Sequence, residues 1–306
     1  MTTALYSHPA AQAHLMPPGH PEQVARYAAV IAALDGLALD RREAPLGDEA
    51  DILRCHPAAY LDRIRDSVPA AGFAMLDADT HLSPGSFEAA LRAVGGACAA
   101  VDAVLAGEAA NAFVAMRPPG HHAERETPMG FCLFGTVAIA ARHALDRHGL
   151  SRVAVLDFDV HHGNGTQDLL WDEARAFFAS THQMPLYPGS GVPTERGAHG
   201  QIMNAPLPPG SGGVEALAAW RHVLDRCRDF NPQLILVSAG FDAHRDDPLA
   251  QLNWTERDFA AITQAICKLA AECGAAVVSS LEGGYDLAAL GRSVRAHVEC
   301  LVEAGN

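Results

Sequence analysis

The sequence predicts a single α/β domain of three layers, in which a mostly parallel sheet is covered by helices on both faces. Short apolar runs rich in β-branched residues alternate with longer helical segments along nearly the whole chain. Runs such as Leu234–Val237 are apolar at every position, which is typical of strands buried on both faces of a parallel sheet. No internal repeat, low-complexity linker or heptad pattern divides the chain. We therefore expect residues 1–306 to form one domain.

Proline, glycine and acidic residues mark the ends of the elements expected in the first half of the chain. Pro21 and Glu22 suit the first turn of a helix, since proline needs no hydrogen-bond partner there and an acid favours the positive end of the helix dipole. The Pro84-Gly85 turn precedes a helix rich in small residues. The expected elements are a strand at 5–7, a loop at 8–20, a helix at 21–34, a strand at 37–43, short helices at 50–55 and 57–64, a loop at 70–85, a helix at 86–107 and a strand at 112–116.

The second half continues the alternation. Thr255 is a suitable N-cap for a long helix. The loop at 182–200 is rich in glycine and proline, and its length alone favours a functional role. The expected elements are a helix at 131–148, strands at 152–156 and 176–181, a helix at 214–230, a strand at 234–238, a helix at 255–273, a strand at 276–280 and a final helix.

Composition limits the class of protein and its partners. The formal net charge is −14 and no basic stripe is present, which argues against a nucleic-acid partner and favours cationic substrates. The seven cysteines lie in apolar contexts without a CxxC motif, as in reduced, cytosolic proteins. There is no signal-peptide pattern and no apolar run of membrane-spanning length. We expect a cytoplasmic protein without a membrane partner, and leave open whether it forms a homo-oligomer.

The segment Asp157–Gln167 organises the rest of the chain. It follows a buried strand, so its acids lie at the carboxyl end of the sheet, where open α/β sheets bind ligands. If the extended geometry continues, Asp157, Asp159 and His161 project to one side. Carboxylates and an imidazole that converge in a buried place need compensation by a cation or by hydrogen-bond donors, and zinc accepts this ligand set. The alternative is an acidic strand end with a solvated histidine pair.

Three other strand ends carry polar residues beside glycine: His121-His122, Asp242 and Tyr285. In a parallel sheet all these turns lie along the same edge, so residues more than a hundred positions apart can share one pocket. A metal, a histidine and a tyrosine hydroxyl gathered in one pocket can activate a water, transfer a proton and stabilise a developing negative charge.

The motifs at these strand ends resemble those of the histone deacetylase family, in its class II-like branch, which includes bacterial acetylpolyamine amidohydrolases. The resemblance runs in order from about residue 14 to the final helix. It implies the arginase/deacetylase fold and zinc-dependent hydrolysis of an N-acetyl amide, from acetyl-lysine side chains or acetylpolyamines. The motifs are Arg117-Pro118-Pro119-Gly120-His121-His122, Asp157-Phe158-Asp159-Val160-His161-His162-Gly163-Asn164-Gly165-Thr166, Ser238-Ala239-Gly240-Phe241-Asp242-Ala243-His244 and Leu281-Glu282-Gly283-Gly284-Tyr285.

The resemblance also implies a role for each matching residue. Asp159, His161 and Asp242 would bind one catalytic zinc ion per chain. His121 and His122 would handle protons, and Tyr285 would donate its hydroxyl to the substrate carbonyl. The remaining implied residues are Asp157 and Asn164 as partners of the histidines; Phe131, Tyr187, Leu249, Gly130 and the rim acid Asp79 around the substrate; and Asp157, Asp159, His161, Ser180 and Thr181 at an inner potassium site.

Two positions depart from the commonest family pattern. Asn164 stands where part of the family has aspartate; a neutral amide can orient His122 but stabilises its cation less than a carboxylate would. This leaves open which histidine is the base and which the acid. The frequent His-Pro-Glu-Arg reads His20-Pro21-Glu22-Gln23, although Arg26 remains.

Two alternative functions fit the residues less well than deacetylation does. An arginase-like binuclear hydrolase needs more aspartates than Gly163-Asn164 and Asp242 offer. A metal-bound sensor or scaffold without catalysis needs neither Tyr285 nor the histidine pair. The expected partner is a small cationic acetylated substrate or an acetyl-lysine peptide.

Overall fold

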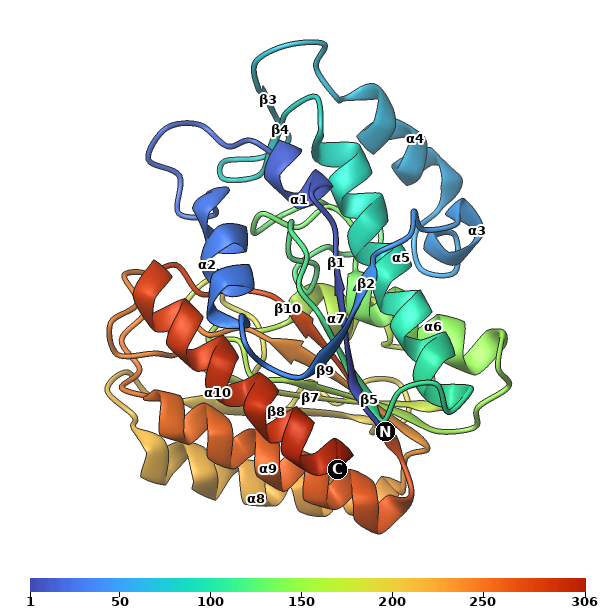
Figure 1. The fold of residues 1–306 in the computed structure, drawn as a ribbon, viewed down its shortest axis with the longest axis vertical. Helices are drawn as coiled ribbons and strands as arrows, with labels where there is room; N and C mark the ends of the chain where they lie inside the picture. Colours follow the sequence, from blue (N-terminus) through green and yellow to red (C-terminus); the bar gives the residue numbers. More distant parts are fainter.

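An eight-stranded parallel sheet forms the centre of the computed structural model, which describes residues 1–306 (Figure 1). All the neighbouring strand pairs are parallel. In spatial order the strands are β2 (Leu39–Glu43), β1 (Thr3–Ser7), β5 (Asn111–Val114), β10 (Ala276–Leu281), β9 (Leu234–Ala239), β6 (Val153–Asp157), β7 (Ala176–Gln183) and β8 (Ile202–Leu207).

Alternating side chains of the strands divide the core into two layers. On β6, Val153 and Val155 belong to one hydrophobic cluster, whereas Ala154 and Leu156 belong to the other. Helices α5 (Ser86–Leu105) and α6 (Thr136–Asp146) cover the first face. Helices α8 (Gly213–Phe230), α9 (Glu256–Cys273) and α10 (Leu287–Gly305) cover the second face and lie together below the sheet in Figure 1. The expected three-layer α/β class is confirmed.

The expected helix at 21–34 begins only at Ala25, because Pro21 and its neighbours first form a turn in which the Gln23 N–H donates to the Pro21 carbonyl.

Short helices and strands also occupy several stretches that were expected to be loops. Strand β8 was missed, since Asn204 and Pro206 are poor strand formers that an edge strand tolerates. The remaining elements are α1 (Ala10–Ala13), α2 (Ala25–Ala33), α3 (Glu49–Ile52), α4 (Ala58–Asp66), the hairpin of β3 (Ala74–Met75) and β4 (His81–Leu82), and α7 (Asn164–Leu169).

The helix expected at 131–148 is shorter than predicted and begins at Thr136. Phe131 has φ 69°, in the left-handed region, so it cannot belong to a right-handed helix. The five residues before the helix instead form part of the loop that leads from the end of β5.

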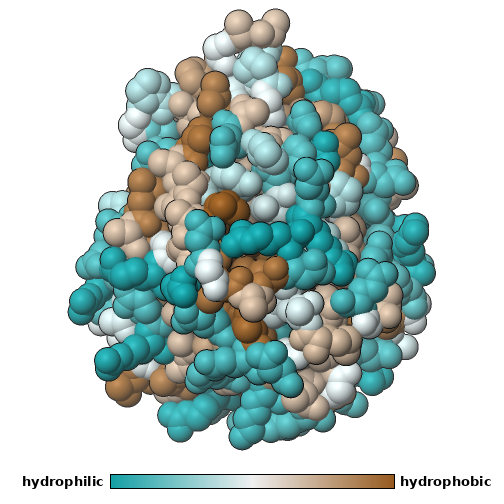
Figure 2. Space-filling view, in the orientation of Figure 1, coloured by the Kyte–Doolittle hydropathy of each residue, from teal (hydrophilic) through white to brown (hydrophobic).

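None of the helices combines the length and the apolar character needed to cross a bilayer. On the face shown in Figure 2, hydrophobic residues form separate patches among hydrophilic ones.

Candidate active site

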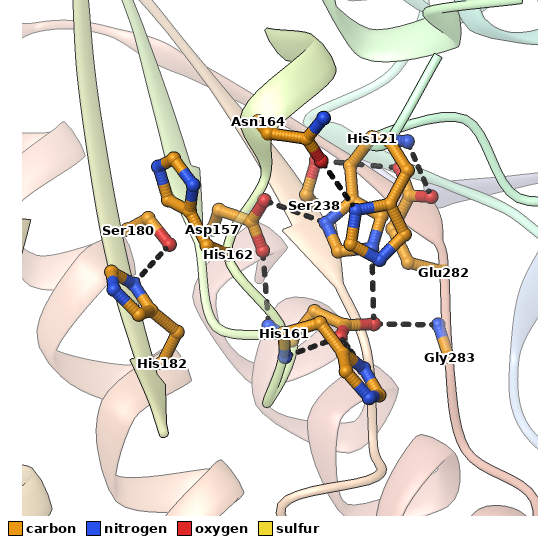
Figure 3. A network of polar contacts seen from close by, with 12 residues as sticks. His121, Asp157, His161, His162, Asn164, Ser180, His182, Ser238, Glu282 and Gly283 are labelled. Carbon is orange, nitrogen blue, oxygen red and sulfur yellow. Dashed lines mark hydrogen bonds and ion pairs between the residues drawn. The ribbon is translucent and has the colours of Figure 1, made fainter. Parts of the chain in front are cut away.

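Four adjacent strands carry the predicted catalytic and metal-binding residues at their carboxyl ends. The strands β5, β10, β9 and β6 are consecutive in the sheet, so the segments that follow them meet at one place. His121 and His122 follow β5, Tyr285 follows β10, Asp242 follows β9 and Asp157 ends β6. Figure 3 shows part of this convergence: His121, Asp157, Ser238 of β9 and Glu282 after β10 lie in one polar network.

The three predicted metal ligands form one buried cluster. Their candidate ligand atoms all lie within 4.8 Å of one another. His161 Nδ1 lies 3.0 Å from Asp159 Oδ1 and 3.2 Å from Asp242 Oδ2. The Gly283 N–H donates to Asp159 Oδ2 at 2.9 Å, and the Val160 N–H donates to Asp242 Oδ1 at 2.9 Å. The backbone therefore holds both carboxylates in place.

The cluster forms through a turn and not through a continued strand. Strand β6 ends at Asp157. The Asp159 N–H then donates to Asp157 Oδ1 at 3.0 Å, and the His161 N–H donates to Asp159 Oδ1 at 2.9 Å. The three residues meet as expected, but the expected extended backbone from 157 to 161 was wrong. The side chains of Asp157 and Asp159 each accept a hydrogen bond from the backbone N–H two residues ahead, and this bends the chain.

Electrostatics of the cluster suit a cation. Burial disfavours the imidazolium of His161, but its hydrogen bonds to Asp159 and Asp242 outweigh burial and raise its pKa to about 10. Burial and the neighbouring charge of Asp159 raise the pKa of Asp242. Two buried carboxylates around one imidazole thus hold a proton at neutral pH, and a divalent cation can replace that proton. The donor set of two oxygens and one nitrogen is one that zinc accepts.

The paired histidines differ in their partners. His121 Nδ1 lies 3.0 Å from Asp157 Oδ2 (Figure 3), whereas His122 Nδ1 lies 2.7 Å from Asn164 Oδ1. The Asn164 amide also donates to Glu124 Oε1 at 2.7 Å, which fixes its orientation so that the oxygen faces the imidazole. Both predicted orienting residues therefore contact the predicted histidines.

These partners give the two imidazoles opposite charge states. Burial lowers the pKa of His121, but the carboxylates of Asp159 and Asp157 outweigh it and hold that pKa well above its usual value. Burial, together with the positive charges of His121 and His161, holds the pKa of His122 well below its usual value. These opposite pKa shifts favour a protonated His121 and a neutral His122.

The predicted substrate residues line one pocket of about 260 Å³ above this cluster. Burial and the neighbouring Asp77 raise the pKa of Asp79, which is one of the residues that line this pocket. The Tyr187 ring stands edge-on to His122, with 5.2 Å between the ring centroids. The lining residues are Pro21, Asp79, His122, Gly130, Phe131, His161, Leu186, Tyr187, Leu249 and Tyr285.

A tight backbone turn places one wall of the pocket. Gly130 and Phe131 have φ 55° and 69°, so two consecutive residues adopt left-handed geometry. A Cβ added to Gly130 would lie 2.4 Å from His122 Cδ2. Only glycine lets this backbone pass so close to the imidazole.

Sequence reasoning missed several residues that support the site. Glu282 is fully buried; its Oε2 accepts from the N–H groups of Gly120 at 2.6 Å and His121 at 3.1 Å, and its Oε1 accepts from Ser238 Oγ at 3.3 Å. Burial raises the pKa of Glu282 to about 7. Its place directly before Gly283-Gly284 at a strand end was the signal that could have identified it.

Tyr285 has two further supports that were not predicted. Asp247 Oδ2 accepts from the Tyr285 N–H at 2.7 Å, and Asp247 Oδ1 accepts from the Leu249 N–H at 3.0 Å. The Arg26 guanidinium lies over the Tyr285 ring at 4.9 Å and donates to the carbonyls of Glu282 and Gly284. Arg26 in turn pairs with the buried Glu22 at 2.9 Å, an i,i+4 spacing that is visible in the sequence.

The residues of the implied potassium site lie on adjoining segments. Ser180 pairs in register with Asp157 across β6 and β7, and Thr181 follows it. Ser180 Oγ lies 2.9 Å from His182 Nδ1, while the buried Thr181 Oγ1 has no hydrogen-bond partner. The structure thus brings the five predicted residues to one region, where Asp157 is also the partner of His121.

Comparison with known proteins agrees with this geometry. The model of the histone deacetylase domain matches residues 20–301. An uncharacterised protein of Synechocystis sp. is 43% identical over 92% of this chain and 93% of its own length. The histone deacetylase-like amidohydrolase of Pseudomonas aeruginosa is 44% identical over 81% of this chain and 66% of its own length. The crystal structure of the HDA15 HD domain aligns with a TM-score of 0.94 and 30% identity, covering 99% of this chain and 89% of that one. The fold is thus the arginase/deacetylase fold, and the chain belongs to the histone deacetylase family.

Proposed function

We propose that this protein is a zinc-dependent amidohydrolase that removes acetyl groups from N-acetylated amines, either acetyl-lysine side chains or acetylpolyamines. The observation that carries the proposal is the meeting of three metal-ligating side chains, a neutral histidine and a tyrosine at the end of one pocket. Family membership supports the deacetylase class of reaction. Zinc and the identity of the amine are the parts that we infer.

Asp159, His161 and Asp242 would hold the ion, which when bound would polarise the acetyl carbonyl and lower the pKa of the attacking water. Three protein ligands leave one position open for substrate and water, as catalytic zinc sites require. The fit rests on the donor set: two buried carboxylates held by backbone N–H groups, and one imidazole between them.

The proton route follows from the charge states of the two histidines. His122 is neutral and lines the pocket, so it can accept a proton from the attacking water and return it to the leaving amine. His121 is held as a cation by Asp157 and Asp159 and stabilises negative charge that develops nearby. Tyr285 would donate its hydroxyl to the carbonyl oxygen as that oxygen gains charge.

The pocket favours a linear acylamine. Phe131, Leu186 and Leu249 give it apolar walls that suit a methylene chain, while Asp79 at the edge suits a cationic group beyond that chain. The net charge of −14 also favours cationic substrates. Acetyl-lysine peptides and acetylated spermidine both meet this description.

The test is acetate release from acetyl-lysine peptides and from acetylated spermidine and putrescine, measured before and after removal of divalent ions. We expect turnover of at least one of these classes, its loss after chelation, and its recovery on addition of zinc. The ratio of kcat/KM values between the classes identifies the substrate. Full activity after prolonged chelation would exclude the metal mechanism, and a metal-loaded protein that releases no acetate from any of them would favour a sensor or scaffold.

A further inference from the structure

A second group of metal-ligating side chains lies in the helical layer of α3, α5 and α6, outside the residues that line the catalytic pocket. Asp102 on α5, His143 on α6 and His148 just after α6 place their candidate ligand atoms within 4.8 Å of one another. We propose that these three residues bind a divalent transition-metal ion of the zinc type, distinct from the catalytic ion.

The two imidazoles converge on a single oxygen. Asp102 Oδ1 lies 2.7 Å from His143 Nε2 and 2.6 Å from His148 Nε2. Ligands bound to one tetrahedral ion at about 2.1 Å lie about 3.4 Å apart, so both separations need to widen by roughly 0.7 Å. The side chains of Asp102 and His148 are partly exposed and can make this adjustment. The predicted catalytic ligands are contracted in the same manner, with separations of 3.0 and 3.2 Å.

An orienting carboxylate already stands behind the buried histidine. His143 Nδ1 lies 2.8 Å from Asp51 Oδ1, so its other nitrogen, Nε2, is directed at Asp102. This carboxylate–histidine arrangement is the one that fixes the ring and increases its basicity at zinc sites. Arg54 pairs with Asp51 at 3.0 Å and balances its charge, which leaves Asp102 as the anionic ligand.

The donor set and the exposure define the kind of ion. Two imidazoles with one carboxylate suit zinc and similar transition ions, whereas calcium and magnesium prefer oxygen ligands alone. A neighbouring group, formed by Asp51, Cys98 and His143, is fully buried, and Arg54 already occupies its carboxylate. The outer group is open to solvent at His148, whose side chain is 28% exposed, so an ion can enter and its fourth position can hold water.

Binding would connect elements that are distant in sequence. The ion would join α5 to the turn that leads from α6 to β6, the strand that ends at Asp157. None of its ligands lines the catalytic pocket. We therefore expect an effect on metal content and thermal stability, with acetate release within about twofold of wild type, a change below 1 kcal/mol by rate arithmetic.

The experiment is dialysis of the full chain against buffered zinc at increasing concentration, followed by metal analysis. Wild type should reach two ions per chain. Asp102→Asn and His148→Gln should each reach one while keeping acetate release, and the control His222→Ala, which removes an exposed histidine of α8, should reach two. Asp242→Asn should also reach one but lose acetate release, which separates the two sites.

Thermal unfolding supplies an independent reading. Addition of zinc beyond one equivalent should raise the Tm of wild type and of His222→Ala, but not the Tm of Asp102→Asn or His148→Gln. The proposal is overturned if wild type saturates at one ion, or if both variants still bind two. In that case the cluster is a network of hydrogen bonds and ion pairs only.

Discussion

At the scale of single residues, the partners of the two histidines decide which one can accept a proton. Asp157 stabilises a cation on His121, whereas the neutral amide of Asn164 does not do so for His122. The sequence did not decide which of the two imidazoles is the base, and these contacts now predict an answer. His122 acts as the base, and its low pKa places the acidic limb of the activity profile below pH 6.5.

Replacement of Asn164 by aspartate tests this assignment. A carboxylate 2.7 Å from Nδ1 would favour the imidazolium, so the pKa of His122 should rise. The acidic limb of kcat/KM should move to higher pH in Asn164→Asp, measured as a pH–rate profile. Asp168→Asn, a charge change that lies on the same short helix and contacts the Arg125 N–H, is the control and should leave the limb in place. An unchanged profile in Asn164→Asp would assign the base elsewhere.

Tyr285→Phe removes one hydroxyl and keeps the ring that packs beneath Arg26. The loss of one oxyanion donor costs on the order of 10² to 10³ in turnover, about 3 to 4 kcal/mol. The loss should fall on kcat because the interaction strengthens in the transition state. Metal content and Tm should match wild type. A variant that keeps its metal and turns over within about threefold of wild type, under 1 kcal/mol, would show that Tyr285 is not the donor.

Glu282 makes stability depend on pH. Its pKa is raised to about 7 by burial, above the ordinary value of 4.5. Between these two values the folded protein retains a proton that the unfolded chain has lost, so the free energy of unfolding falls as pH rises, by about 3 kcal/mol in total. Glutamine can accept from Gly120 and donate to Ser238 without ionising. The Tm of Glu282→Gln should therefore fall by less than the Tm of wild type when the pH is raised from 5 to 8. An equal fall in Tm for both proteins would contradict this prediction.

At the scale of elements, the turn at Gly130 and Phe131 determines where the pocket wall meets the catalytic histidine. Gly130→Ala introduces a Cβ 2.4 Å from the His122 ring, in addition to the strain of a left-handed alanine. Gly200→Ala is a matched control, since Gly200 also has positive φ but no atom within 4 Å. Gly200→Ala should lose about 1 to 2 kcal/mol of stability from the left-handed strain alone, and Gly130→Ala should lose more because its Cβ also meets the His122 ring. Only Gly130→Ala should lose at least tenfold in kcat/KM, and equal activities would show that the contact does not position His122.

The same turn explains why one element was predicted wrongly. The sequence from Phe131 to His148 is apolar enough for a helix, but the backbone at Phe131 is determined by its hydrogen bond to Thr80 and by the close approach of the preceding Gly130 to the His122 ring. The Thr80 hydroxyl accepts from the Phe131 N–H at 3.1 Å. Such a contact joins residues 51 positions apart, and local propensity carries no information about it.

At the scale of the whole molecule, parallel topology made most of the site predictable. Polar residues beside glycine at the ends of buried strands must meet at one sheet edge, and four adjacent strands bring them together. The residues that hold the Tyr285 segment in place could not be predicted from this topology. Arg26 and Asp247 act through backbone groups of the Tyr285 segment, and neither belongs to a strand-end turn beside glycine. Their partners are defined only once the chain has folded.

Net charge is the property of the whole molecule that bears on substrate choice. A charge of −14 should attract polycationic acetylated amines, and screening over about 10 Å at 0.1 M salt should weaken this attraction. The kcat/KM for acetylated spermidine should therefore fall as salt rises, whereas that for a neutral acetylated amine should stay level.

Asp79→Asn should reduce the dependence of this kcat/KM on salt, because the Asp79 carboxylate lines the pocket. Asp225→Asn removes the same charge from α8, outside the pocket lining, and should leave most of the response intact. Equal flattening by both variants would assign the attraction to the overall charge, and a level response in wild type would remove electrostatic attraction as a source of specificity.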